Sequence, residues 1–168
     1  MVFDYNWKNK EANFGPPIKN QVNDGTHISF EIILKKDEKY VALRRKSIPG
    51  HEPPQNVEQY YKNKLFFCHD LIRYGESVED CVKRIVKYQT GALINNCMVI
   101  YIESEVQEKD NQWAFTPHVI AKLKNLPKLG FYGNEITEVI TFTKKDIPNE
   151  FGWWEKEDLK SFLEEYDN

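Results

Sequence analysis

The chain lacks the features that mark secreted, membrane-spanning and nucleic-acid-binding proteins. It has only three cysteines, none of them in a CxxC pair, so the sequence indicates reduced thiols rather than a disulfide framework. No apolar run approaches the roughly 20 residues that a membrane-spanning helix needs, and the stretch MVFDYNWKNKEANFG has no apolar centre like that of a secretory signal. A formal net charge of −3 gives no general attraction to DNA or anionic lipid. We therefore expect a cytoplasmic protein without a membrane or DNA partner.

The length and the turn signals indicate one domain behind a polar arm. A chain of 168 residues is long enough for a sizeable hydrophobic core. Residues 1–26 are polar and interrupted by Gly and Pro turn signals, whereas apolar runs begin directly afterwards. We expect an N-terminal arm over 1–26 and a folded domain over 27–168.

Hydrophobic periodicity predicts a sheet between two helices. Apolar runs predict strands over 27–36, 40–46, 65–68, 97–105, 113–124 and 135–143, and the proline-rich stretch 48–64 is expected to be a loop. A helix over 77–90 is predicted because Ser77 is a strong N-cap and Gly91 is a suitable stop. A second amphipathic helix is predicted over 155–166. This order describes an α+β protein, an α/β/α sandwich with a mixed central sheet.

The segment 70–92 carries a family resemblance. Within it, YGESVEDCVKRIVKYQTGA resembles the Nudix hydrolase signature, Gly-x5-Glu-x7-Arg-Glu-aliphatic-x-Glu-Glu-x-Gly-aliphatic. When Arg84 is placed on the arginine of this pattern, Glu76 falls on its first Glu and Gly91 on its last Gly. The resemblance implies a Nudix-like fold across about residues 27–166. In that fold Gly75, Glu76, Arg84 and Gly91 would be structural, with Glu76 and Arg84 paired.

The same register removes the carboxylates that hold magnesium in this family. The remaining glutamates of the pattern fall on Ile85, Tyr88 and Gln89, and its leading Gly falls on Asp70. An alkyl group, a phenol and an amide are poor ligands for Mg²⁺, which is held through carboxylates and substrate phosphates. We therefore expect no cofactor and no standard catalytic or metal-ligating residue. The expected role is binding of a nucleotide-like or phosphorylated ligand without the standard hydrolysis.

Two other functions stay open. Asp70, Glu76 and Glu79 could form a relocated magnesium site, with Glu76 and Glu79 acting in catalysis. The chain would then be an active pyrophosphohydrolase of nucleoside diphosphate-linked substrates. Alternatively, the exposed aromatic residues could serve a scaffolding domain that forms a homodimer.

Five residues are candidates for binding a nucleotide-like ligand. The basic residues Arg44, Arg45 and Arg73 could bind a phosphate, although a solvated strand edge would explain them equally simply. Phe131 and Tyr132 lie between two glycines, so a loop tip could expose them for stacking on a base. Packing in the core or at an interface is the plain alternative for both aromatic residues.

The remaining candidates have weaker patterns. Cys68 could be a nucleophile with His69 as its base, but no third partner or oxyanion motif is visible, and His69 alone reads as an ordinary loop histidine. His118 has no zinc-type spacing to other ligand residues. Trp153 and Trp154 could stack on a nucleobase, or they could be core residues.

Overall fold

The computed structural model describes residues 26–46, 63–73, 75–107, 112–131 and 136–167. Residues 1–25 of the arm expected over 1–26, most of the loop over 48–64, Tyr132 and the segment 108–111 between the strands expected over 97–105 and 113–124 lie outside the described residues. The elements in chain order are β1 (Thr26–Lys36), β2 (Lys39–Arg45), β3 (Leu65–Phe66), β4 (Cys68–Leu71), α2 (Val78–Thr90), β5 (Ile94–Gln107), β6 (Gln112–Leu123), β7 (Ile136–Phe142) and α4 (Lys156–Tyr166).

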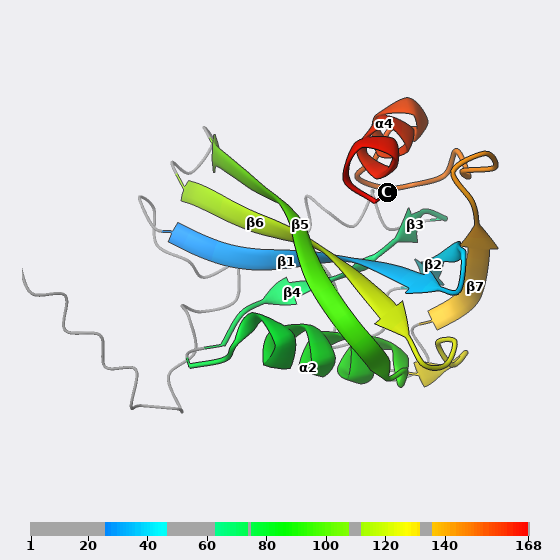
Figure 1. The fold of residues 1–168 in the computed structure, drawn as a ribbon, viewed down its shortest axis with the longest axis horizontal. Helices are drawn as coiled ribbons and strands as arrows, with labels where there is room; N and C mark the ends of the chain where they lie inside the picture. The colour runs from blue at the N-terminus through cyan, green and yellow to red at the C-terminus, as the bar shows by residue number, and fades with distance from the viewer. Residues whose placement is uncertain (1–25, 47–62, 74, 108–111, 132–135, 168) are drawn as a thin grey trace, which may run out of the picture.

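The sheet lies between α2 on one face and α4 on the other, which confirms the predicted layers (Figure 1). Among the described residues it has seven strands in the order β3-β2-β1-β6-β5, with β4 also pairing with β1 and β7 with β2. The pairing of β1 with β6 is parallel and the other pairings are antiparallel, so the sheet is mixed as predicted. Neither described helix has the length and apolar composition of a membrane-crossing segment.

The predicted strand over 65–68 is wrong in one respect, because two short strands replace it. β3 pairs with β2 through Leu65 and Phe66, whereas β4 pairs with β1. The buried Phe67 separates them and stacks against Phe151, with 5.1 Å between ring centroids. The segment 65–71 therefore pairs first with β2, through β3, and then with β1, through β4.

Each face of the sheet has its own hydrophobic core because successive strand residues point to opposite faces. Ile32 and Leu34 of β1 pack with the buried face of α2, and Ile33 packs with the buried face of α4. Leu159 and Leu163 are the fully buried residues of α4. The polar segments on either side of these two cores determine where a ligand could reach the sheet.

Helix α2 begins and ends at the residues that the sequence predicts. The Ser77 hydroxyl accepts the backbone N–H of Asp80 at 3.1 Å and donates to its carboxylate at 2.8 Å. Gly91 has φ of 67° and its N–H donates to the carbonyl of Lys87 at 2.9 Å. A side chain at Gly91 would place Cβ 2.8 Å from the ring of Phe131. Glycine is thus required both by the left-handed backbone and by this close approach.

An irregularity in β5 changes which side chains face α4. The register of β5 against β6 shifts between Val99 and Tyr101, and a β-bulge of this kind reverses the alternation of the following residues. Val99 packs against the core beneath α2, whereas Tyr101 contacts Phe162 of α4. The bulge therefore turns Tyr101, Glu103 and Glu105 to the α4 side, where all three line one pocket.

The C-terminal end of α4 is attached to the β1–β2 hairpin. Lys35 donates to the Asp167 carboxylate at 2.7 Å, and the hydroxyl of Tyr40 donates to the same oxygen. Burial would raise the pKa of Asp167, but the hydrogen bonds from Lys35 and Tyr40 outweigh it and lower that pKa. This attachment fixes α4 over the sheet and so sets the shape of the space beside it.

Candidate functional site

Arg84 of α2 holds the loop that precedes the helix. Its guanidinium donates from Nε to Glu76 Oε1 at 2.5 Å and from Nη2 to Glu76 Oε2 at 3.0 Å. It also donates to the carbonyl of Leu71 at 2.8 Å and to the carboxylate of Asp70 at 3.2 Å. Glu76 in turn accepts the backbone N–H of Arg73 at 2.8 Å. Glu76 and Arg84 therefore pair as the family resemblance implies.

The carboxylates of the alternative magnesium site are engaged elsewhere. Burial would raise the pKa of Glu76, but the hydrogen bonds from Arg84 and from the Arg73 backbone outweigh it and lower that pKa. Asp70 contacts the same guanidinium, whereas Glu79 pairs with Lys83 at 2.5 Å on the helix surface. Among the described residues, no three His, Cys, Asp or Glu side chains are grouped so that they could hold a metal ion.

The positions that correspond to the missing glutamates have structural contacts. Ile85 is fully buried in the core between α2 and the sheet, while Tyr88 is 54% exposed. Gln89 is buried, and its amide Nε2 donates to the carbonyl of His69 at 2.8 Å. Its Oε1 accepts the N–H of His69 at 3.3 Å. Gln89 thus joins α2 to β4.

Two of the predicted phosphate-binding arginines, Arg44 and Arg73, lie at opposite ends of the segment 65–71. Arg44 donates to Glu138 at 2.8 Å, lies 3.9 Å from Glu150 and donates to the carbonyl of Asn63. Arg44 pairs with Leu65 at the start of the 65–71 segment, whereas the exposed Arg73 follows its end. Eight residues of extended chain span roughly 25 Å, so these two side chains lie too far apart to share one phosphate. Arg45 is the last residue of β2 and lies near Cys68.

Phe131 is half-buried rather than exposed, and it packs against Gly91 and the core beneath α2. The close contact with Gly91 fixes the ring against the end of the helix. Its packing therefore corrects the expectation of an exposed stacking residue.

The structure contradicts the hypothesis of a Cys68 nucleophile. Cys68 is fully buried in the core beneath α2, and burial raises the pKa of its thiol to about 12. His69 faces the opposite side of the sheet, where its Nδ1 lies 3.3 Å from Glu31. A strand places neighbouring side chains on opposite faces, so His69 cannot act as the base for Cys68.

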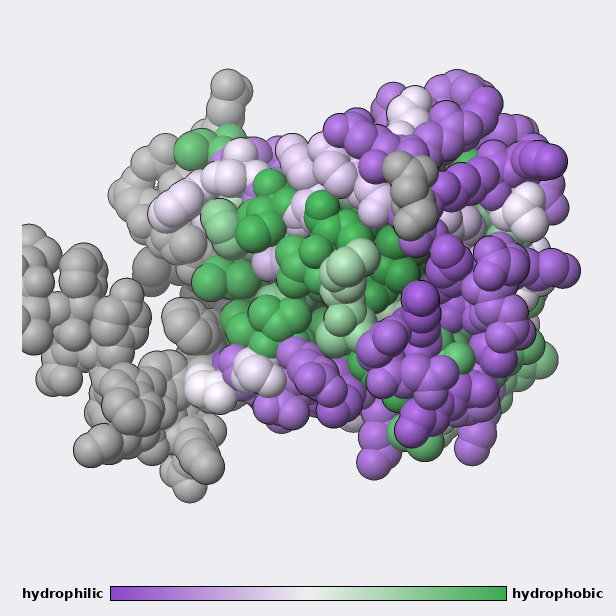
Figure 2. Space-filling view, viewed as in Figure 1, coloured by the Kyte–Doolittle hydropathy of each residue, from purple (hydrophilic) through white to green (hydrophobic). Residues whose placement is uncertain are grey.

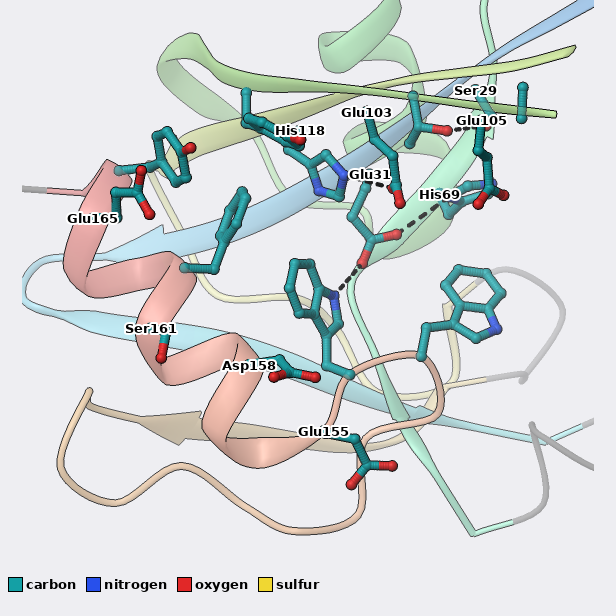
Figure 3. Close-up of a pocket in the computed structure, with 17 residues that line it drawn as sticks. Ser29, Glu31, His69, Glu103, Glu105, His118, Glu155, Asp158, Ser161 and Glu165 are labelled. Carbon is teal, nitrogen blue, oxygen red and sulfur yellow. Dashed lines mark hydrogen bonds and ion pairs between the residues drawn. The ribbon is translucent and has the colours of Figure 1, made fainter.

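An open pocket of about 830 Å³ lies on the α4 side of the sheet (Figure 3). Its lining includes five aromatic side chains, Tyr101, Trp153, Trp154, Phe162 and Tyr166. It also includes six carboxylates, Glu31, Glu103, Glu105, Glu155, Asp158 and Glu165. None of the described residues that line it is Lys or Arg. The pocket therefore combines aromatic surface with concentrated negative charge.

Glu31 lies at the sheet side of this pocket. It is 4% exposed, and one carboxylate oxygen accepts the indole N–H of Trp154 at 3.2 Å. The other oxygen lies 3.3 Å from Nδ1 of His69, whose ring contacts the edge of Trp153 with 4.9 Å between ring centroids. Figure 3 shows Glu31 between His69 and the rings beside α4. These contacts orient both tryptophans relative to the sheet.

His118 is a second polar group of the pocket. Its Nε2 lies 3.2 Å from Glu103, and its ring is surrounded by Tyr101, Trp154 and Phe162 at centroid distances of 5.7, 5.7 and 5.2 Å. The other ring nitrogen, Nδ1, is buried without a hydrogen-bond partner among the described residues. Figure 3 shows the imidazole extending from the sheet into the space beside α4.

The chain was compared with protein-family models, with curated proteins and with solved structures. Neither the family models nor the curated proteins gave a match. Among solved structures, a MutT NUDIX hydrolase from Burkholderia pseudomallei superposes with a TM-score of 0.59 over 85% of this chain and 98% of its own, at 12% identity. The chain has the Nudix fold.

Two further Nudix-fold structures have the same architecture. The MutT protein from Methanosarcina mazei Go1 gives a TM-score of 0.59 at 16% identity, over 85% of this chain and 94% of its own. A NUDIX hydrolase from Nitrosomonas europaea gives 0.56 at 18% identity, over 88% of this chain and 73% of its own. The fold expected from segment 70–92 is therefore confirmed.

Sequence reasoning missed most of the pocket. His69, His118, Trp153 and Trp154 were considered singly, without the acidic residues that lie among them. One available signal was Glu31, a charged residue in the middle of the apolar strand HISFEIILKK. Such a residue within a buried strand usually has a specific partner or a functional role.

Proposed function

We propose that this Nudix-fold protein binds a nucleotide-like ligand in the pocket beside α4 and does not hydrolyse it by the metal-dependent route of the family. The proposal rests on the contacts of the residues that stand where the family pattern has metal-ligating glutamates. Ile85 fills the core, and both polar atoms of the Gln89 amide bond to the backbone of His69. Neither residue offers a carboxylate to a metal ion.

The described residues do not fit a magnesium ion. Phosphoryl transfer by this route uses the metal to neutralise charge on the transferring oxygens. Asp70 and Glu76 contact the guanidinium of Arg84, so a divalent cation bound there would have to displace or face that positive charge. Glu79 lies on the helix surface beside Lys83. A metal-dependent catalytic step therefore has no support among the described residues.

The pocket supports binding of a flat ring. Small-molecule sites commonly have volumes of about 300–1,000 Å³ and aromatic walls with a few polar groups. Trp153 lines this pocket and is 41% exposed, and exposed aromatic rings can stack on a base. Because Lys and Arg are absent from the described lining, a phosphate group would be repelled by the carboxylates. The base would enter the pocket and the phosphate would stay outside.

Calorimetric titration with nucleosides and nucleotides in EDTA tests this proposal. A specific ligand should bind without metal and raise the unfolding temperature, with stabilisation of about 2.7 kcal/mol at a hundredfold excess over Kd. The Trp153→Ala variant should bind more weakly. The proposal fails if no nucleoside or nucleotide binds, or if magnesium produces turnover that requires Glu76.

A second candidate function, self-association, is favoured by the surface of β5. Figure 2 shows a green apolar patch on the face of the molecule where β5 lies in front in Figure 1. The exposed apolar side chains of β5 include Met98, Ile102 and Val106, at 60%, 47% and 59% exposure. Among the described strands β5 pairs only with β6, so its outer edge is available for another strand. Light scattering at micromolar concentration should show a dimer that Ile102→Lys dissociates; a monomer would exclude it.

A further inference from the structure

We infer that the pocket between the sheet and α4 selects a positively charged flat ring, that is, a protonated or N-alkylated nitrogen heterocycle. This inference rests on the proposed function for the location of the site, and it narrows the class of ligand. The sequence indicates a nucleotide-like or phosphorylated ligand, whereas the group recognised here is the positively charged ring.

The ionisable side chains around the pocket are predominantly acidic. Its six carboxylates come from β1, from β5 and from the segment that begins just before α4 (Figure 3). Two of them are contacted by histidines, His69 beside Glu31 and His118 beside Glu103. A concave, partly apolar site lined by one sign of charge concentrates ligands of the opposite sign. The pocket therefore attracts cations, although the whole chain carries a net charge of only −3.

Aromatic side chains form one wall of the pocket. The rings of Tyr101, Phe162 and Tyr166 contact one another at centroid distances between 4.9 and 5.8 Å. Trp154 continues this wall at 5.0 Å from Phe162. Aromatic faces carry negative electrostatic potential and attract cations, most strongly when water is excluded. A flat cation can therefore use the same surface for stacking and for electrostatic attraction.

Two buried polar side chains of the pocket, His118 and Glu31, have unused hydrogen-bonding capacity among the described residues. His118 is 5% exposed, and its Nδ1 has no partner among the described residues. A buried polar atom without a partner is uncommon in native structures and calls for a bound species or a functional role. The buried Glu31 carboxylate is contacted by only the N–H of Trp154 and Nδ1 of His69 among the described residues. A carboxylate has about four lone-pair sites, so Glu31 retains capacity to accept an N–H from a ligand.

The arrangement favours an organic cation over a metal ion. No described group of three or more His, Cys, Asp or Glu side chains could hold a metal ion. Rings occupy much of the wall between the carboxylates, and a hard divalent cation gains little from aromatic carbon. A heterocycle with a delocalised positive charge matches both components, because its faces stack and its N–H edge donates to carboxylate oxygens.

Two isomeric nucleosides provide a matched pair of probes. The ring of 1-methyladenosine is protonated near neutral pH, whereas that of N6-methyladenosine is neutral. Apart from this proton, the two nucleosides differ only in the position of one methyl group. Titration calorimetry at pH 7 in EDTA should show at least tenfold tighter binding of 1-methyladenosine. Glu103→Gln removes one negative charge from the pocket and should therefore reduce this preference several-fold. Glu103 is half exposed, so its replacement is compatible with folding. Glu31→Gln should reduce it further.

Glu164→Gln is the control variant. Glu164 is an exposed residue of α4 next to the pocket residue Glu165, but it does not line the pocket. Glu164→Gln removes the same charge as Glu103→Gln and Glu31→Gln but outside the pocket, so a general effect of net charge would appear equally in this variant. The preference for 1-methyladenosine should be unchanged in Glu164→Gln.

The outcomes separate this inference from the proposed function. Equal binding of the two isomers would overturn the inference and leave the proposed function standing. Binding of N-methylquinolinium without binding of either nucleoside would support the inference and overturn the nucleotide-like ligand. Absence of binding by all three probes would overturn both. A preference that survives both Glu103→Gln and Glu31→Gln would overturn the assignment to this pocket.

Discussion

The side-chain amide of Gln89 bonds to both backbone groups of His69, donating to its carbonyl at 2.8 Å and accepting its N–H at 3.3 Å. An amide can do this because it supplies one donor and one acceptor, as a neighbouring strand would. A glutamate at this position would accept from the N–H but would place negative charge against the carbonyl. The residue at a position where the family pattern has a glutamate therefore attaches α2 to β4.

Gln89→Glu should destabilise the protein. Loss of one buried hydrogen bond together with an unsatisfied carbonyl costs about 1–3 kcal/mol. The loss should be largest at neutral pH and should shrink in acid, because a protonated carboxyl can donate to the His69 carbonyl. Urea unfolding at pH 7 and pH 4 measures it. Tyr88→Glu is the control, since Tyr88 is 54% exposed and its replacement should cost much less. An equal effect of both changes would contradict the role of Gln89.

Glu76→Gln should weaken the attachment of the loop before α2. Hydrogen bonds to charged groups contribute about 1.5–3 kcal/mol, and Glu76 accepts two from Arg84. Glu79→Gln, which breaks only a surface pair with Lys83, should cost much less. Denaturant unfolding of the three proteins at neutral pH gives both differences.

The contribution of Glu76 should also depend on pH. Its pKa is lowered in the folded state, where hydrogen bonds from Arg84 and Arg73 outweigh its burial. Stabilisation by the charged form is therefore fully present above the unfolded-state pKa of about 4.3 and is lost as the pH falls through the lower folded-state value. The difference between the wild type and Glu76→Gln should be constant from pH 5 to 7 and decrease below that range. A difference that grows in acid would contradict this linkage.

Gly91→Ala should destabilise the end of α2. A side chain in the left-handed region costs about 1–2 kcal/mol, and Cβ would also lie 2.8 Å from the Phe131 ring. In a Phe131→Ala background the second cost is removed, so Gly91→Ala should then cost less. A double-mutant cycle by thermal unfolding measures this coupling. If the free-energy changes of Gly91→Ala and Phe131→Ala simply add, the contact with the Phe131 ring does not contribute to the cost of Gly91→Ala.

Alkylation should distinguish the three thiols. Burial raises the pKa of Cys68 and of Cys81 to about 12, and Cys97 is only half-buried with a pKa raised by burial to a smaller extent. Iodoacetamide at pH 8 should modify Cys97 slowly in the native protein, and all three cysteines after denaturation. Mass spectrometry of the peptides locates the label. Rapid modification of native Cys68 would contradict its burial and would restore the nucleophile hypothesis.

The sequence predicts those features that depend on neighbouring residues. The N-cap Ser77, the stop at Gly91 and the pair of Glu76 with Arg84 follow from local spacing and from the family pattern. The division of 65–71 into two strands does not, because it depends on where β2 separates from β1. A short apolar run contains no information about two different partners.

The pocket is the larger feature that the sequence does not predict, and there is a physical reason for this. Its side chains come from β1, β4, β5, β6 and the C-terminal segment, and they meet only after the sheet has formed. The bulge between Val99 and Tyr101 determines that Glu103 faces α4, and nothing in the alternation of β5 announces it. The buried position of Glu31 was readable from its apolar neighbours, but its contacts with Trp154 and His69 were not.

The most direct test of the central claim is cleavage of the pyrophosphate linkage in the presence of Mg²⁺ or Mn²⁺, measured as release of nucleoside monophosphate from nucleoside triphosphates and nucleoside diphosphate-linked compounds. Ile85, Tyr88 and Gln89 stand where the family pattern has glutamates, so we predict that the protein releases no more nucleoside monophosphate than the Glu76→Gln variant. Metal-dependent turnover in the wild type that is absent from Glu76→Gln would contradict the claim.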